Sequence, residues 1–268
     1  MRHFAVLAAL AILPAAADAQ NAYRRVPGDT LRYEESMTIA STAATPMGEV
    51  TTEAKSEGAT IFVFRTTDSV SVTMHPTKMT MKMPSGDYSP DVTGLRGAVF
   101  EMVMHANGEL RILTRPELPA DLAAVSGSVN TVADFFVRLP GRDLDLGAMW
   151  TDTIVISDST AEMRITSRRV ASYTVEKDTI IDGRNAWVIA GTGDTQLEST
   201  GTLAPMDASM SVSMKVRDSD RAVITRDGTM LLREVLMEQS GTSRIVTLSA
   251  PMEMPITGTI ALKRRLVL

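Results

Sequence analysis

The sequence predicts a mainly-β protein: a curved antiparallel sheet, built either as one half-barrel or as two related β units, with one central helix. Three observations lead to this prediction. Apolar and polar residues alternate along most of the chain, turn residues separate the alternating runs, and one stretch has helical spacing instead.

The alternation is clearest in three places. Residues 31–39, 210–216 and 256–268 each place apolar side chains on one face of a strand and mainly polar side chains on the other. A period of two with one polar face is typical of antiparallel strands that cover a core on one side. Thr, Val, Ser and Ile are frequent throughout, and they suit such half-buried pleated surfaces.

Short turn sequences separate these runs. Asn-Gly and Asp-Gly pairs between apolar runs are strong hairpin signals, because both central positions of the turn need a positive φ. We therefore expect turns at Pro27-Gly28-Asp29, Glu57-Gly58, Asn107-Gly108, Asp182-Gly183, Asp227-Gly228 and Ser240-Gly241.

Residues 119–140 interrupt the alternation. Their apolar residues stand three or four positions apart, as on one helix face, with Pro119 at the start and Pro140 at the end. Gly127 weakens the middle, so a broken helix is one alternative and a linker between two domains is another. The stripe consists of Leu122, Val125, Val129, Val132, Phe136 and Leu139.

Similar glycine turns bracket the two halves of the chain. Gly28 and Gly108 are separated by nearly the same distance as Gly147 and Gly228. We interpret this as an ancient duplication, although short matches between Thr-rich strands also arise by chance. The predicted boundaries are a signal peptide at 1–19, a first β unit at 20–118, the connecting helix at 119–140, and a second β unit at 141–268 packed as one body with the first.

The first residues have the three parts of a secretory signal. Arg2 supplies the positive start, residues 4–13 form a short apolar run, and Ala17-Asp18-Ala19 offers a cleavage site near Ala19. An N-terminal core helix is the alternative. With no cysteine for a lipid anchor or a disulfide, we expect an exported protein, periplasmic or extracellular, stabilised by its core alone.

The net charge and the low aromatic content argue against several classes of protein. A formal net charge of −5 gives no electrostatic reason to bind nucleic acid or anionic lipid. No later segment supplies the run of about 20 apolar residues that a transmembrane helix needs. Barrels of the outer membrane carry aromatic girdles at both interfaces, and six Phe, four Tyr and two Trp are too few. We therefore expect a soluble chain that does not span a membrane.

The segment L-P-G-R-D-L-D-L-G-A-M-W (Leu139 to Trp150) resembles a central element of a known group of proteins. An L-P…G-D-x-W pattern of this kind occurs in uncharacterised secreted bacterial proteins with a duplicated β architecture; here Ala148 stands where that pattern has Asp. The overall plan is also similar to the LolA and LppX lipoprotein-carrier half-barrels, although no motif residue carries across. That second resemblance implies a concave apolar face that could hold an acyl chain.

The chain contains 18 Met, which suggests a flexible apolar lining. Rows such as Met79-Thr80-Met81-Lys82-Met83 would project their thioethers from one face of a strand. We expect these residues to line a concavity for a hydrophobic or acyl ligand, or else to form a closed core. The candidates are Met79, Met81, Met83, Met102, Met104, Val129, Val132, Phe136, Met210, Val212 and Met214.

A Cu(I) site is the alternative interpretation, because thioethers with a nearby imidazole suit this ion. Against it, the row at Met210 and Met214 in the second half has no histidine. The candidate ligands are Met74, His75, Met79, Met81, Met104 and His105.

No catalytic constellation is visible in the sequence. The mature chain has only two histidines, and G-x-S-x-G, H-E-x-x-H and phosphate-loop motifs are absent. Acidic pairs such as Asp218 with Asp220 lie in polar or turn-like stretches and need no catalytic role. We expect a non-enzymatic binding protein without a cofactor; a purely structural or protein-interaction domain is a further alternative.

Overall fold

The computed structural model describes residues 22–46, 48–84, 86–116, 130–142, 144–159, 163–203, 208–247 and 251–267. Among these residues, twelve strands form one antiparallel sheet in the order β6-β5-β3-β2-β1-β12-β11-β10-β9-β8-β7, with β4 paired to β3 beside this path. The strands are β1 (Thr30–Thr45), β2 (Gly48–Phe64), β3 (Ser69–Met83), β4 (Gly86–Tyr88), β5 (Ala98–Met104), β6 (Leu110–Thr114), β7 (Met149–Ser159), β8 (Met163–Ile181), β9 (Arg184–Leu203), β10 (Ala208–Thr225), β11 (Met230–Val246) and β12 (Pro251–Val267).

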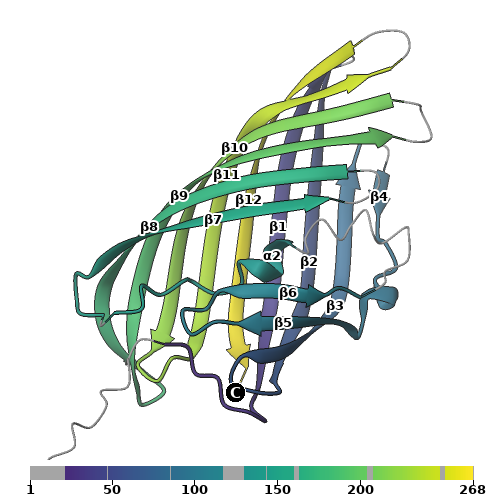
Figure 1. Cartoon of the computed structure of the whole chain (residues 1–268). Coiled ribbons are helices and arrows are strands. Elements are labelled where there is room, and N and C mark those ends of the chain that lie inside the picture. The colour runs from purple at the N-terminus through teal and green to yellow at the C-terminus, as the bar shows by residue number, and fades with distance from the viewer. Residues whose placement is uncertain are drawn as a thin grey trace, which may run out of the picture.

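The sheet is strongly curved but not closed. It curls around a single-turn helix, α2 (Asn130–Ala133) (Figure 1). In the described part of the chain β6 and β7 are not paired with each other, so they are the two edges of the sheet. The predicted mainly-β fold with a curved antiparallel sheet is confirmed.

We call the face of the sheet toward α2 the inner face and the opposite face the outer face. Side chains alternate between the two faces, and the strand register aligns inner positions across neighbouring strands. Tyr33 of β1 lies opposite Thr60 of β2 and Leu266 of β12, and all three are buried.

The end of the sheet that contains Tyr33 and Phe62 is filled with side chains, and we call it the closed end. Residues 134–139, which we call the crossing segment, run over its inner face. Phe135 and Phe136 of this segment are 1% exposed and lie with their ring centroids 4.7 and 5.2 Å from that of Phe62. Tilted and edge-to-face aromatic packing of this kind stabilises a dry core.

The long central helix predicted at 119–140 is not supported. Within the described residues only α2 is an α-helix there, and η1 (Thr93–Leu95) is a short 3₁₀ helix; residues 117–129, including Val129, lie outside the described residues. From Asp134 onward the chain leaves the helix. Arginine side chains, rather than helix amides, donate hydrogen bonds to the carbonyls of Asp134 and Phe135. Of the predicted stripe, the described residues Val132, Phe136 and Leu139 are buried as expected, but the backbone after Ala133 is not helical.

The predicted turns divide into two groups. Asn107-Gly108, Asp182-Gly183 and Asp227-Gly228 lie at hairpins, and their glycines have positive φ. Gly58 and Gly241 instead lie inside β2 and β11. At Gly241 a Cβ would come within 2.1 Å of the Ser213 carbonyl oxygen, so glycine there permits close strand approach rather than a turn.

Candidate functional site: an apolar trough above a buried charge network

Beyond the closed end, the inner face of the described strands continues as a mainly apolar surface whose apolar side chains are partly exposed. Each of its residues is half-buried, in contrast to the fully buried core. The registers place Ile39 opposite Ile260, and Ile260 opposite Met237, across three adjacent strands. We call this surface the trough; its main residues are Met37, Ile39, Met79, Met81, Val212, Met214, Val216, Met237, Ile256 and Ile260.

The outer face of the same strands is polar. Next to Met214 and Met237 in sequence stand Lys215 and Glu238, which point to the opposite side and are exposed. Arg217 of β10 is 85% exposed and forms an ion pair with Asp194 of β9. The described inner face of the open end is thus mainly apolar, with a few neutral polar side chains such as Ser41 and Gln239, and the outer face is charged.

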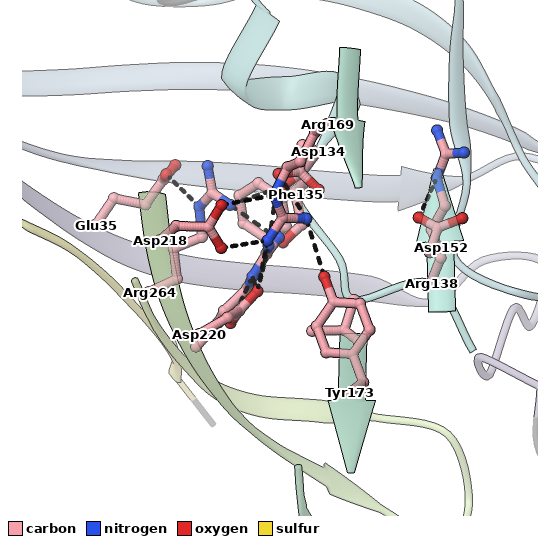
Figure 2. Close-up of polar contacts among 12 residues, drawn as sticks. Glu35, Asp134, Phe135, Arg138, Asp152, Arg169, Tyr173, Asp218, Asp220 and Arg264 are labelled. Atoms are coloured by element: carbon pink, nitrogen blue, oxygen red, sulfur yellow. Dashed lines mark hydrogen bonds and ion pairs between the residues drawn. The ribbon is translucent and has the colours of Figure 1, made fainter. Parts of the chain in front are cut away.

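A buried charge network separates the trough from the closed end (Figure 2). Arg169 of β8 donates two hydrogen bonds to the Asp218 carboxylate, at 2.9 and 2.6 Å. Arg233 of β11 binds Asp220 at 2.7 Å. Among the described residues the network consists of Glu35, Asp134, Arg169, Asp218, Asp220, Arg233 and Arg264.

Small residues on β9 make room for the network. A Cβ on Gly193 would come within 2.5 Å of an Asp218 carboxylate oxygen, and a Cβ on Gly191 would come within 2.4 Å of the Tyr173 ring. The Tyr173 hydroxyl in turn accepts a hydrogen bond from Arg169. Alternate glycines on the inner face of one strand therefore create the space that a buried aromatic ring and a carboxylate occupy.

The arginines of the network act as a clamp on the crossing segment. Arg264 donates to Glu35 at 2.9 Å and also to the carbonyls of Asp134 and Phe135. Its guanidinium carbon lies 4.2 Å from the centroid of the Phe135 ring. Burial lowers the pKa of Arg264, whereas the neighbouring Asp220 and Asp134 outweigh burial and raise the pKa of Arg233. The network thus joins the crossing segment to β11 and β12 through Arg233 and Arg264.

A cavity of about 100 Å³ lies where the trough meets the network. Its lining includes Glu35, Met37, Thr60, Met74 and Leu262. The Thr60 hydroxyl donates a hydrogen bond to the Glu35 carboxylate. The trough therefore has mainly apolar walls, and the Glu35 carboxylate lies at its floor.

The structure divides the predicted ligand-lining residues between the two ends. Met79, Met81, Met83, Met210, Val212 and Met214 lie in the trough or along its rim, on the inner face of β3 and β10. Met102, Met104, Val132 and Phe136 are buried in the closed end instead, at 0–3% exposure, and line no open surface. Sequence alternation alone does not separate these groups, because both occupy inner positions.

The structure does not assemble the alternative copper ligands. Met74, Met79 and Met81 share the inner face, but His75 follows Met74 directly and points to the outer face. Met104 is buried in the core, and His105 is exposed at the turn after β5. Within the described residues no cluster of three or more His or carboxylate side chains suited to a metal is present.

The charge network itself was missed by sequence reasoning. Asp218 and Asp220 occupy the same alternating row as Met214 and Val216, so both carboxylates point inward. The sequence predicts a polar or turn-like stretch here, but the two residues lie inside β10 and are 8% and 4% exposed. The sequence did contain a signal for the network, because Asp218 and Asp220 stand at the same alternate positions as the apolar residues of the row. An acidic residue at such a position needs a buried partner.

No family model and no curated protein matches the sequence. Among solved structures, Neisserial surface protein A is similar over 87% of this chain and 96% of its own, with 7% identity and a TM-score of 0.24. OccK7 of Pseudomonas aeruginosa covers 90% of this chain and 99% of its own, with 8% identity and a TM-score of 0.26. OmpF of Salmonella typhi, solved with daunomycin, covers 87% and 97%, with 7% identity and a TM-score of 0.25.

These matches are outer-membrane β-barrel proteins, which are embedded in a membrane. Beside these neighbours we do not maintain the prediction of a chain that does not span a membrane. The TM-scores indicate no shared fold, and we take neither a function nor a membrane position from them. The likeness to LolA and LppX is not shown by these comparisons either. Among the described residues, no helix is long and apolar enough to cross a membrane.

Proposed function

We propose that the trough binds one apolar or amphiphilic small molecule, and that the protein serves as an exported, non-enzymatic binding protein. One observation supports this proposal above all. The inner face of the open end is apolar and only half-buried, although the same sheet has a packed core at its other end. A concave apolar surface with a few polar groups at one place is typical of a small-molecule site.

The chemistry of the trough suits a flexible chain better than a rigid ring. Met37, Met79, Met81, Met214 and Met237 contribute unbranched thioethers, which adapt to ligands of irregular shape. Each methylene of an acyl chain that leaves water here gains roughly 0.8 kcal/mol. A chain of a dozen carbons therefore has enough apolar surface to offset the cost of immobilising it.

Native mass spectrometry tests the proposal most simply. Protein purified from its own cell envelope should carry an additional mass that dissociates as a lipid or another amphiphile. A mass equal to that of the bare polypeptide in every preparation, with no binding of the dye Nile red, would contradict the proposal and favour a structural or protein-interaction role.

A matched pair of variants tests whether the ligand binds on the inner face. Met237→Glu puts a charge into the trough, and Leu236→Glu puts the same charge on the outer face of the same strand, where Leu236 is 49% exposed. We expect Met237→Glu to weaken Nile red binding by about tenfold or more, because the carboxylate would lose water against an apolar ligand. Leu236→Glu should leave binding unchanged. Equal effects of both variants would exclude the trough as the site.

A further inference from the structure

We infer that the amphiphile held in the trough has a positively charged polar end, such as a protonated amine. This inference rests on the proposed function and adds the charge of the ligand to it. It is carried by the distribution of charge between the walls and the floor of the trough.

The walls of the trough carry no charge. Beyond the charge network, every described inner-face side chain of β1, β2, β3, β10, β11 and β12 is apolar or neutral, whereas the outer face of these strands carries Lys, Arg and Glu. A charged group on a bound ligand therefore has one place on the inner face of these strands where a complementary charge is available, and that place is the network at the floor.

Among the described residues the network has an excess of negative charge, and its most exposed members are carboxylates. It contains the guanidiniums of Arg169, Arg233 and Arg264 against four carboxylates. The side chains of Arg233 and Arg264 are 1% exposed, whereas those of Glu35 and Asp134 are 22% and 27% exposed. Arg169 is 10% exposed, so the most accessible groups of the network are the carboxylates of Glu35 and Asp134.

The Asp134 carboxylate has capacity for another donor. Its Oδ2 atom lies 3.5 Å from Arg233 and 3.9 Å from Arg169, which is long for a charge-assisted hydrogen bond. The shorter bonds from Arg233 and Arg264 go to the backbone carbonyl of Asp134. The adjoining Arg138 forms ion pairs with the carboxylates of both Glu109 and Asp152. An ammonium group near Asp134 would neutralise the excess charge of the network, whereas an anion would double it.

Three ligands of equal chain length test this inference on the unmodified protein. Dodecylamine, dodecanol and dodecanoate would be compared at neutral pH, below their micelle concentrations, by displacement of Nile red and by titration calorimetry. We expect dodecylamine to bind about tenfold or more tightly than dodecanoate, with dodecanol between them, because a charge-assisted contact contributes about that much.

Other rankings of the three ligands would overturn the inference. Dodecanoate binding as tightly as dodecylamine would show that the floor does not select for charge. Equal binding of dodecanol and dodecylamine would show that the positive charge plays no part. Failure of all three ligands, and of Nile red, would contradict the proposed function as well, so the two failures are distinguishable.

An isosteric variant locates the selectivity. Asp134→Asn removes one negative charge and leaves the backbone carbonyl that the arginines bind, and Asp194→Asn makes the same change on the outer face, where Asp194 is 83% exposed. Asp134→Asn should reduce the preference for dodecylamine over dodecanoate by about tenfold, while Asp194→Asn should preserve it. An unchanged preference in folded Asp134→Asn protein would overturn the assignment to Asp134. If this variant does not fold, the ligand ranking on the unmodified protein still decides.

Discussion

The two ends of one sheet have the same alternation of residues, yet one end is a closed core and the other is an open trough. All five phenylalanines in the described residues are buried in the closed end, where the crossing segment covers the sheet. The open end has Met, Ile and Val at its inner positions and no such cover among the described residues. Closing the interior of a curved sheet thus takes aromatic volume and a second layer, and alternation alone supplies neither.

The largest expected difference between the ends concerns truncation of a large side chain. Phe62→Ala should lower the free energy of unfolding by about 4 kcal/mol, because Phe62 is fully buried against Tyr33, Phe135 and Phe136. Met214→Ala in the half-buried trough should cost about 1 kcal/mol or less. Urea denaturation of both variants checks this, and similar losses would mean that the two ends are packed alike.

The boundary between the ends should be nearly as sensitive. Arg233→Ala leaves the buried Asp220 carboxylate without its partner and releases the crossing segment, so we expect a loss of about 3 kcal/mol. Arg217→Ala breaks only the exposed pair with Asp194 and should cause no measurable loss. Chemical denaturation compares the two, and a harmless Arg233→Ala would show that the network does not join the crossing segment to the sheet.

The glycines of β9 test the packing around the network. Gly191→Ala would force its new methyl group against the Tyr173 ring, and we expect a loss of about 2 kcal/mol from overpacking. Thr192→Ala changes the adjacent, exposed position on the outer face and is the control, expected to stay within about 0.5 kcal/mol of the unmodified protein. An unchanged free energy of unfolding in the Gly191→Ala variant would contradict the close packing that we describe around Tyr173.

The smallest expected effect is pH-dependent and concerns Asp152, near the edge of the network. Burial raises the pKa of this carboxyl above its ordinary value of 3.8, against the lowering effect of Arg138, and one buried carboxylate oxygen has no hydrogen-bond partner. The folded state therefore holds the proton more tightly than the unfolded chain, so ionisation of Asp152 destabilises the fold above its folded-state pKa.

Asp152→Asn should consequently increase the free energy of unfolding at neutral pH, and the gain should disappear as the pH falls below 3.8. Urea denaturation at several pH values measures this. A gain independent of pH, or a loss of stability at neutral pH, would contradict the assignment of a raised pKa to Asp152.

The sequence predicted the sheet well because its signals are local. Period-two rows locate β1, β10 and β12, and Asp182-Gly183 with two positive φ angles connects β8 to β9 as its residue types require. The crossing segment could not be predicted, because the spacing of Val132 and Phe136 is equally suited to a helix and to an irregular chain pressed into a core.

The predicted duplication stays a prediction, but the turns that suggested it make the same hydrogen bonds. Gly28 donates to the Phe64 carbonyl as Gly147 donates to that of Val175, each fixing the start of a half to a neighbouring strand. Two further glycine turns, at 105–108 and 225–228, each close with a bond from the glycine to the residue three positions earlier. The sequence contained these turns, whereas the contacts between β8, β10 and β11 that build the charge network depend on register across the whole sheet.

Single-cysteine labelling tests the central claim, an inner face closed at one end and open at the other, most directly. The chain has no native cysteine, so Met102→Cys, Met237→Cys and Leu236→Cys each supply one thiol, in the core, the trough and the outer face. We predict that a soluble maleimide modifies the Leu236→Cys protein with or without dodecylamine, modifies the Met237→Cys protein only without it, and leaves the Met102→Cys protein unmodified. A Met237→Cys protein as unreactive as Met102→Cys in the absence of ligand would contradict the account.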